Sequence, residues 1–176
     1  LDTQVFLTQS DTGSDTVTLK GNGDMLLSAG DSDADHINGR AGLNTLAQAT
    51  AAALAQRGIT TVHVNYDDMP APANPDDSAG YPELSQHTAA DVAATFSGLL
   101  QQHGITVEAE PAAHAAPQGA NPIASVSSAT LSEILAFMLR HSDNTLAEEF
   151  GRLTALARSE NNGPEGATKA VRTVLG

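Results

Sequence analysis

Apolar and polar positions alternate along residues 3–8 and again along residues 15–20, on either side of Thr12-Gly13-Ser14. Alternation with a period of two is typical of strands that are buried on one face. A short segment with a glycine between two such runs is typical of a β-hairpin. We therefore predict a pair of strands with a short turn at the start of the chain.

The pattern then changes to helical spacing. Residues 42–57 are rich in Ala and Leu and stop before Gly58, and residues 59–66 alternate again and are rich in β-branched side chains. The same order recurs, with a helix predicted over 88–103 and a strand over 105–110. Helices that alternate with strands predict an α/β layer.

Two segments have the composition of loops. Residues 67–86 contain four prolines and two Asp-Asp pairs, and residues 111–122 contain no charge and are rich in Pro, Ala and Gly. Such composition favours irregular structure. We expect a long surface loop at the first segment and a linker at the second, which divides the chain into residues 1–122 and 123–176.

The piece from residue 123 onward has helical spacing, and we expect it to be helical throughout. Ser128 or Thr130 can cap a first helix, and Thr130 forms a capping box with Glu133. A second helix is expected after Asn144 and a third near Pro164. The apolar face of the first helix consists of Leu131, Ile134, Leu135, Met138 and Leu139.

Charge separates the same two pieces. The chain has 8 basic and 21 acidic residues, a net charge of −13, and 15 of the acidic residues precede residue 123. This surplus disfavours binding to nucleic acid or to an anionic membrane surface. The absence of cysteine excludes disulfides and thiol catalysis. The first residues lack the pattern of a signal peptide, so we expect any export signal to lie outside this chain.

The tripeptide Ser142-Asp143-Asn144 lies between two helices with apolar stripes. Taken alone, it is typical of an N-cap for the second helix. In penicillin-interacting serine enzymes, however, an S-D-N element places a hydroxyl and a carboxamide beside the nucleophile. Both interpretations remain open on the residues alone.

Residues 124–156 (ASVSSATLSEILAFMLRHSDNTLAEEFGRLTAL) resemble the second-motif region of the D-alanyl-D-alanine carboxypeptidase/endopeptidase family, the class C low-molecular-mass penicillin-binding proteins. Residues 1–27, 59–68 and 163–176 resemble that family in the same order. The resemblance implies an α+β fold, with an α/β accessory region over 1–122 and, over 123–176, the helical part of a serine DD-peptidase/β-lactamase-like domain.

The resemblance implies two site residues and no cofactor. Ser142 would relay a proton, and Asn144 would hold the amide of a peptidoglycan stem peptide or a β-lactam. Neither Lys20 nor Lys169 stands in an S-x-x-K or a K-T-G motif, and Met25 replaces a proline that the family prefers. We therefore expect an inactive fragment of an exported serine-type D-Ala-D-Ala carboxypeptidase, located at the cell envelope or secreted.

Two alternatives remain. The α/β body could be a non-catalytic module that binds or scaffolds the cell wall, or the acidic run Asp31-Ser32-Asp33-Ala34-Asp35 could begin a calcium loop. An EF-hand needs Gly at the sixth position and Glu at the twelfth, where this chain has His36 and Gly42, so we expect no metal. The six histidines show no zinc-binding spacing.

The fragment hypothesis also predicts an exposed apolar patch that could bind a hydrophobic dye or a second copy of the chain. Its residues would be Leu131, Leu135, Leu139, Phe150 and Leu153.

Overall fold

The structure is a computed structural model that describes residues 1–11, 13–67, 88–160 and 164–175. The predicted loop 67–86 lies outside these residues except for its first residue, which ends a strand. Within them, the chain is an α+β fold with one mixed sheet and five helices, as the sequence predicts.

The predicted hairpin is confirmed. β1 (Asp2–Thr8) and β2 (Asp15–Lys20) pair antiparallel, with Val5 opposite Leu19. Both of these side chains are fully buried, because alternate positions of each strand face the same side of the sheet. The hairpin thus supplies two strands of the core.

The predicted α/β layer is confirmed, but the strand predicted after its second helix is shorter than expected. It contains α1 (Leu43–Ala55), β3 (Thr61–Asp67) and α2 (Ala89–Gln102). β3 runs parallel to β2 and pairs along its other edge with two short parallel strands, β4 (Thr106–Val107) and β5 (Ala112–Ala113). The strand predicted over 105–110 is therefore only two residues long, and β5 lies within the predicted linker.

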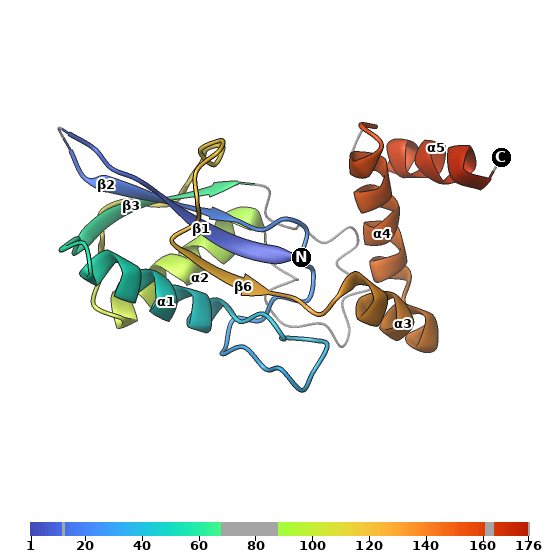
Figure 1. The fold of residues 1–176 in the computed structure, drawn as a ribbon, viewed down its shortest axis with the longest axis horizontal. Helices are drawn as coiled ribbons and strands as arrows, with labels where there is room; N and C mark the ends of the chain where they lie inside the picture. Colours follow the sequence, from blue (N-terminus) through green and yellow to red (C-terminus); the bar gives the residue numbers. More distant parts are fainter. Residues whose placement is uncertain (12, 68–87, 161–163, 176) are drawn as a thin grey trace.

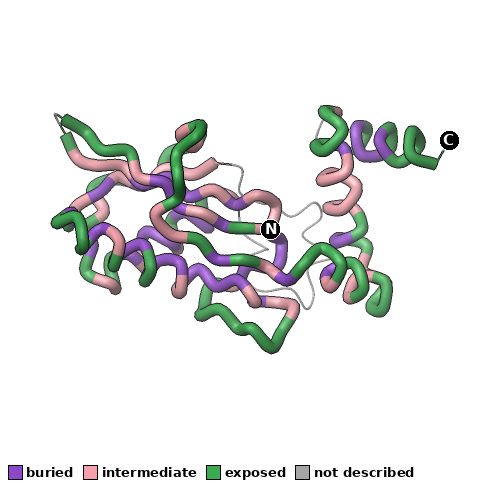
Figure 2. Tube along the Cα trace, in the orientation of Figure 1, coloured by how far each residue is buried: buried purple, intermediate pink, exposed green. Residues whose placement is uncertain are grey.

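The sheet has the order β4-β3-β2-β1-β6, and α1 and α2 lie against one face of it (Figure 1). Figure 2 shows that the buried residues concentrate between this face and the two helices. The largest fully buried side chains of this core are Phe96, Leu19, Leu43, Leu46, Leu54, Leu100, Val5, Val17, Val62, Val64 and Val92.

The expectation that the chain is helical throughout from residue 123 is wrong at its first element. β6 (Ala124–Ser127) is a strand that pairs antiparallel with β1. Its four residues are too short and too weakly apolar to show a strand pattern, and its partner lies more than a hundred residues earlier. The division of the chain after residue 122 stays a proposal, although one sheet extends across it.

The three helices predicted after β6 are confirmed as α3 (Leu131–His141), α4 (Asn144–Ala157) and α5 (Pro164–Leu175). They extend away from the sheet at the end where β6 leaves it (Figure 1). Gly151 brings α4 close to α5, since a Cβ at that position would lie 3.3 Å from the Cβ of Ala167. No helix in the described part of the chain is long and apolar enough to cross a membrane.

The predicted apolar patch is confirmed at three of its five positions. Leu131, Leu135 and Leu139 of α3 are exposed, with 67% of Leu139 accessible. Phe150 and Leu153 of α4 are half-buried instead. They line a narrow cavity together with residues of the segment that follows β2, and that contact shields them from solvent.

Candidate functional site

Ser142 forms the turn between α3 and α4. Its backbone is left-handed, with φ 53° and ψ 46°, and the N–H groups of Ser142 and Asp143 both donate to the carbonyl of Met138. This arrangement closes the end of α3. Glycine is the usual residue at such a position, because a side chain there costs about 1 kcal/mol. The serine is therefore held where the backbone itself favours glycine.

Asp143 has a structural role. It is the N-cap of α4, and its carboxylate accepts a hydrogen bond of 2.9 Å from the N–H of Leu146. The N-cap interpretation of the tripeptide is thus correct for its middle residue. The residues on either side of it, Ser142 and Asn144, are both exposed to solvent.

The turn rests on a small apolar core that is separate from the core of the sheet. Leu146, in the first turn of α4, is 2% exposed and packs with Ile134 of α3. Met25 and Leu26, which belong to the segment 21–27 after β2, complete this core with Ala129. We call residues 21–27 the supporting loop, because they bring the sheet into contact with the two helices that flank Ser142.

Asp24 of the supporting loop is buried, with 1% of its surface exposed. One carboxylate oxygen, Oδ1, accepts a hydrogen bond of 3.0 Å from the N–H of Leu26, and the other, Oδ2, is buried without a partner among the described residues. Burial raises the pKa of Asp24 from 3.8 to about 6, and the smaller effects of the Leu26 hydrogen bond and the amino group of Leu1 oppose that shift.

A second contact joins the body of the molecule to α3. Arg40 lies 3.2 Å from the carboxylate of Glu133, which also completes the capping box with Thr130. Hydrogen bonds from the Thr130 side chain and backbone, aided by Arg40, hold the pKa of Glu133 below its usual value. The predicted cap is therefore confirmed, and Arg40 ties it to the segment that precedes α1.

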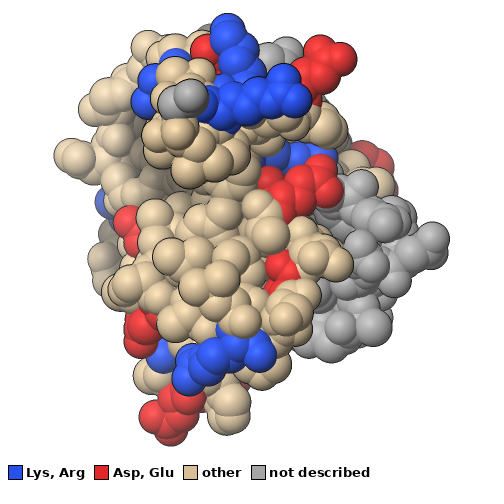
Figure 3. All heavy atoms as spheres, turned by 90° about the vertical axis from the view of Figure 1, so that its right-hand side faces the viewer, with Lys and Arg blue, Asp and Glu red and all other residues tan. Residues whose placement is uncertain are grey.

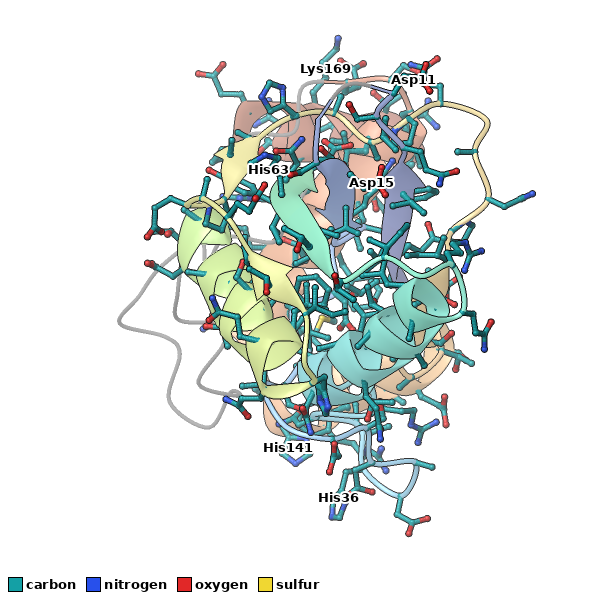
Figure 4. The ribbon with its side chains drawn as sticks, turned by 90° about the vertical axis from the view of Figure 1, so that its left-hand side faces the viewer. Asp11, Asp15, His36, His63, His141 and Lys169 are labelled. Carbon is teal, nitrogen blue, oxygen red and sulfur yellow. The ribbon has the colours of Figure 1, made fainter. Side chains whose placement is uncertain are left out.

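His141 does not form a catalytic pair with Ser142. Its ring stacks on Phe137 with centroids 4.2 Å apart, and its Nδ1 lies 2.8 Å from the carbonyl oxygen of Phe137. The residue is exposed at the end of α3. In Figure 4, Lys169 lies at the top of the view and His141 at the bottom, and the ammonium group of Lys169 is paired with Glu160 at 2.7 Å.

The acidic run of the calcium hypothesis lies in an exposed loop. Asp31 accepts a hydrogen bond of 2.7 Å from Asn44, and Asp33 accepts one from the N–H of Asp35 and contacts His36. Over the described ranges, no three His, Asp or Glu side chains come together in a way that could hold a metal ion.

His63 makes a cross-strand contact from β3. Its Nε2 lies 3.5 Å from the carboxylate of Glu108, just after the neighbouring β4, and the hydroxyl of Ser14 donates to the same carboxylate. Asp15, labelled on the adjacent strand β2 in Figure 4, pairs with Val62 rather than with His63. All of these groups are at least partly exposed, and they lie on the sheet rather than at the helix junction.

The face that carries α3, α4 and α5 is mostly uncharged. Figure 3 shows a broad area of uncharged residues between separate groups of basic side chains. The exposed leucines of α3 belong to this face, so the turn with Ser142 and Asn144 borders an apolar surface. The sequence missed two groups that contact the helices flanking this turn, Asp24 and Arg40. An aspartate directly before the apolar run Met25-Leu26-Leu27 is a signal of burial.

Comparison with known proteins agrees with this arrangement. A search of curated proteins gave no match. Penicillin-binding protein 4 of Haemophilus influenzae, solved with a β-lactam, shares the fold with a TM-score of 0.67 at 13% identity. The match covers 99% of this chain but 55% of that one. A model of the D-Ala-D-Ala carboxypeptidase 3 (S13) family matches residues 74–176, which include the Ser142 turn. The chain therefore belongs to the D-Ala-D-Ala carboxypeptidase 3 (S13) family.

Proposed function

We propose that this chain is part of a serine-type D-Ala-D-Ala carboxypeptidase and supplies its second catalytic motif through Ser142 and Asn144. The observation that supports this most is the geometry of the turn. A capping Asp143 fixes the backbone, while the hydroxyl and the carboxamide on either side of it stay exposed. The turn also lies within the residues that match the family.

The proposed reaction is acyl transfer. A nucleophilic serine, supplied by an S-x-x-K motif that these 176 residues do not contain, attacks the carbonyl carbon of the terminal D-Ala-D-Ala bond. The C–N bond breaks, and the serine proton passes through the hydroxyl of Ser142 to the departing amine. Water then hydrolyses the ester, which releases the shortened peptide and the free serine.

The carboxamide of Asn144 has the binding role in this proposal. It can donate to a carbonyl and accept from an N–H, which suits the amide of a stem peptide or of a β-lactam. The proposed substrate is therefore the peptidoglycan stem peptide, and the proposed location is outside the cytoplasm, in the envelope or secreted. No cofactor is needed for this chemistry.

The test uses the native gene product. Source cells are exposed to labelled penicillin, the product is captured with an antibody raised against this chain, and its mass and label are read. We expect label on a polypeptide heavier than 18.0 kDa, and no label on the isolated 176-residue chain. Ser142→Ala in the native product should slow labelling, whereas the matched change Ser132→Ala, on the exposed first turn of α3, should not.

The second candidate is a non-catalytic module that binds or scaffolds the cell wall. It is favoured by the sequence before the two lysines. An S-x-x-K motif needs serine three residues before the lysine, but Val17 stands there before Lys20 and Gly166 before Lys169. A captured product without label, and with no S-x-x-K or K-T-G in its coding region, would support this candidate against the enzyme.

A further inference from the structure

We propose that Asp24 is a positioning residue for the Ser142–Asn144 turn, and that its uncharged carboxyl holds the supporting loop in the shape on which the turn rests. The link between Asp24 and catalysis rests on the proposed function. The structural part of the inference stands on contacts between the loop and the two helices.

The first step is the shape of the loop. The Asp24 carboxyl accepts the N–H of Leu26, and the N–H of Asp24 donates to the carbonyl of Gly21. These two hydrogen bonds curl the chain so that Met25 and Leu26 both point into the small core. Gly23 permits the curl with a φ of 81°, a conformation that other residues rarely adopt.

The second step is the contact with the helices. A Cβ on Gly23 would lie 3.0 Å from Leu153 and 3.3 Å from the carboxylate of Glu149, so the loop backbone lies directly against α4. Leu26 packs with Leu146, which is two residues from Asn144. A change in the loop therefore reaches the first turn of α4 through one layer of side chains.

The third step is the charge of Asp24. No arginine or lysine lines its cavity within the described ranges, and the charged groups that do line it are Glu149 of α4 and the amino group of Leu1. The buried Oδ2 atom has no donor there. An ionised Asp24 would thus be a buried charge with no arginine or lysine beside it and with one oxygen unpartnered, which favours the protonated form or a displaced loop. The pKa of about 6 agrees with this reasoning.

The experiment follows the turn by NMR during a pH titration of the isotope-labelled chain. The titration uses a His141→Gln background, so that the imidazole ring next to Ser142 cannot contribute to the shifts of the turn amides. We expect the carboxyl carbon of Asp24 and the amides of Ser142, Asn144 and Leu146 to shift with one shared midpoint near 6. Asp24→Asn, which keeps an acceptor for Leu26, should remove that titration from the amides.

The matched control is Glu149→Gln, which changes the other carboxyl of the cavity and should leave the shared titration in place. An Asp24 midpoint near 3.8, or turn amides that still titrate near 6 in Asp24→Asn, would overturn the proposal. If Asp24→Asn does not fold, the His141→Gln background alone tests the proposal. A midpoint shared by the Asp24 carboxyl and the turn amides would support it, and separate midpoints would contradict it. No substrate is used, so this result is independent of penicillin labelling.

Discussion

Ser142 combines a hydroxyl with a left-handed backbone, and the two properties can be separated by substitution. Glycine removes the hydroxyl and relieves the backbone, whereas alanine removes the hydroxyl and keeps the unfavourable conformation. Loss of activity and loss of stability therefore need not coincide at this position.

We expect Ser142→Gly to have a free energy of unfolding about 1 kcal/mol higher than Ser142→Ala. Chemical denaturation of the two variants, followed by circular dichroism, measures this difference. In the native product, both variants should slow penicillin labelling to a similar extent. Equal stability of the two variants would show that residue 142 does not hold the left-handed conformation.

The burial of Asp24 leads to a second prediction at the scale of the residue, about how the free energy of unfolding depends on pH. Its pKa in the folded chain is above the ordinary value, so the folded state binds its proton more tightly than the unfolded state. The contribution to stability is therefore complete below pH 3.8 and is lost as pH rises to about 6. At 1.36 kcal/mol per pH unit, the loss amounts to at most about 3 kcal/mol.

The measurement is the free energy of unfolding of the wild type minus that of Asp24→Asn, taken across this pH range. We expect the difference to decrease toward neutral pH and then to level off. A difference that increases with pH would mean that Asp24 is stabilised as the charged form.

At the scale of the element, Gly42 is the residue that α1 needs at its start. A Cβ at this position would lie 2.3 Å from the carbonyl carbon of Asp31 and 2.4 Å from the N atom of Ser32. Both are backbone atoms, which cannot move aside as the end of a side chain can. The loop that contains the acidic run thus crosses directly over the N-terminus of α1.

We expect Gly42→Ala to lower the free energy of unfolding by about 3 kcal/mol or more, at the upper end of the cost of overpacking. Gly30→Ala is the matched control, since a Cβ there meets nothing within 4 Å and its backbone is not left-handed. Thermal unfolding of the two variants measures both effects. Similar midpoints for the two would contradict the close approach at Gly42.

The elements themselves were predictable where a local pattern specifies them. The hairpin, α1, β3 and α2 have clear periods, and the Thr130–Glu133 capping box marks the start of α3. β6 and β5 were not predictable, because each is held by a partner strand far away in the sequence. Ser142 and Asn144 could be selected by their motif, but Asp24 is buried by the packing of distant helices, which no local pattern contains.

At the scale of the whole molecule, the apolar surface of α3 predicts binding of hydrophobic ligands. Leu131, Leu135 and Leu139 are exposed on one helix, beside a mostly uncharged face. We expect the isolated chain to bind a hydrophobic dye, and Leu139→Lys to reduce the signal with little change in stability. Leu146→Ala is the contrasting variant and should cost about 3 kcal/mol, because Leu146 is buried.

Dye fluorescence and sedimentation measured on the same samples would distinguish dye binding from association of copies. A chain that binds no dye and stays monomeric would contradict the exposure of α3.

The pairing of β1 with β6 has a consequence for the synthesis of the protein. Asp2 bonds to Ser127, 125 residues later, so one edge of β1 stays unpaired until the ribosome has made and released that segment. At about 5–20 residues per second, this wait is roughly 6–25 s. During that time β1 is an open edge with apolar side chains, the kind of surface that recruits other strands. The nascent chain should therefore depend on chaperones until β6 emerges, although the finished sheet covers that edge of β1.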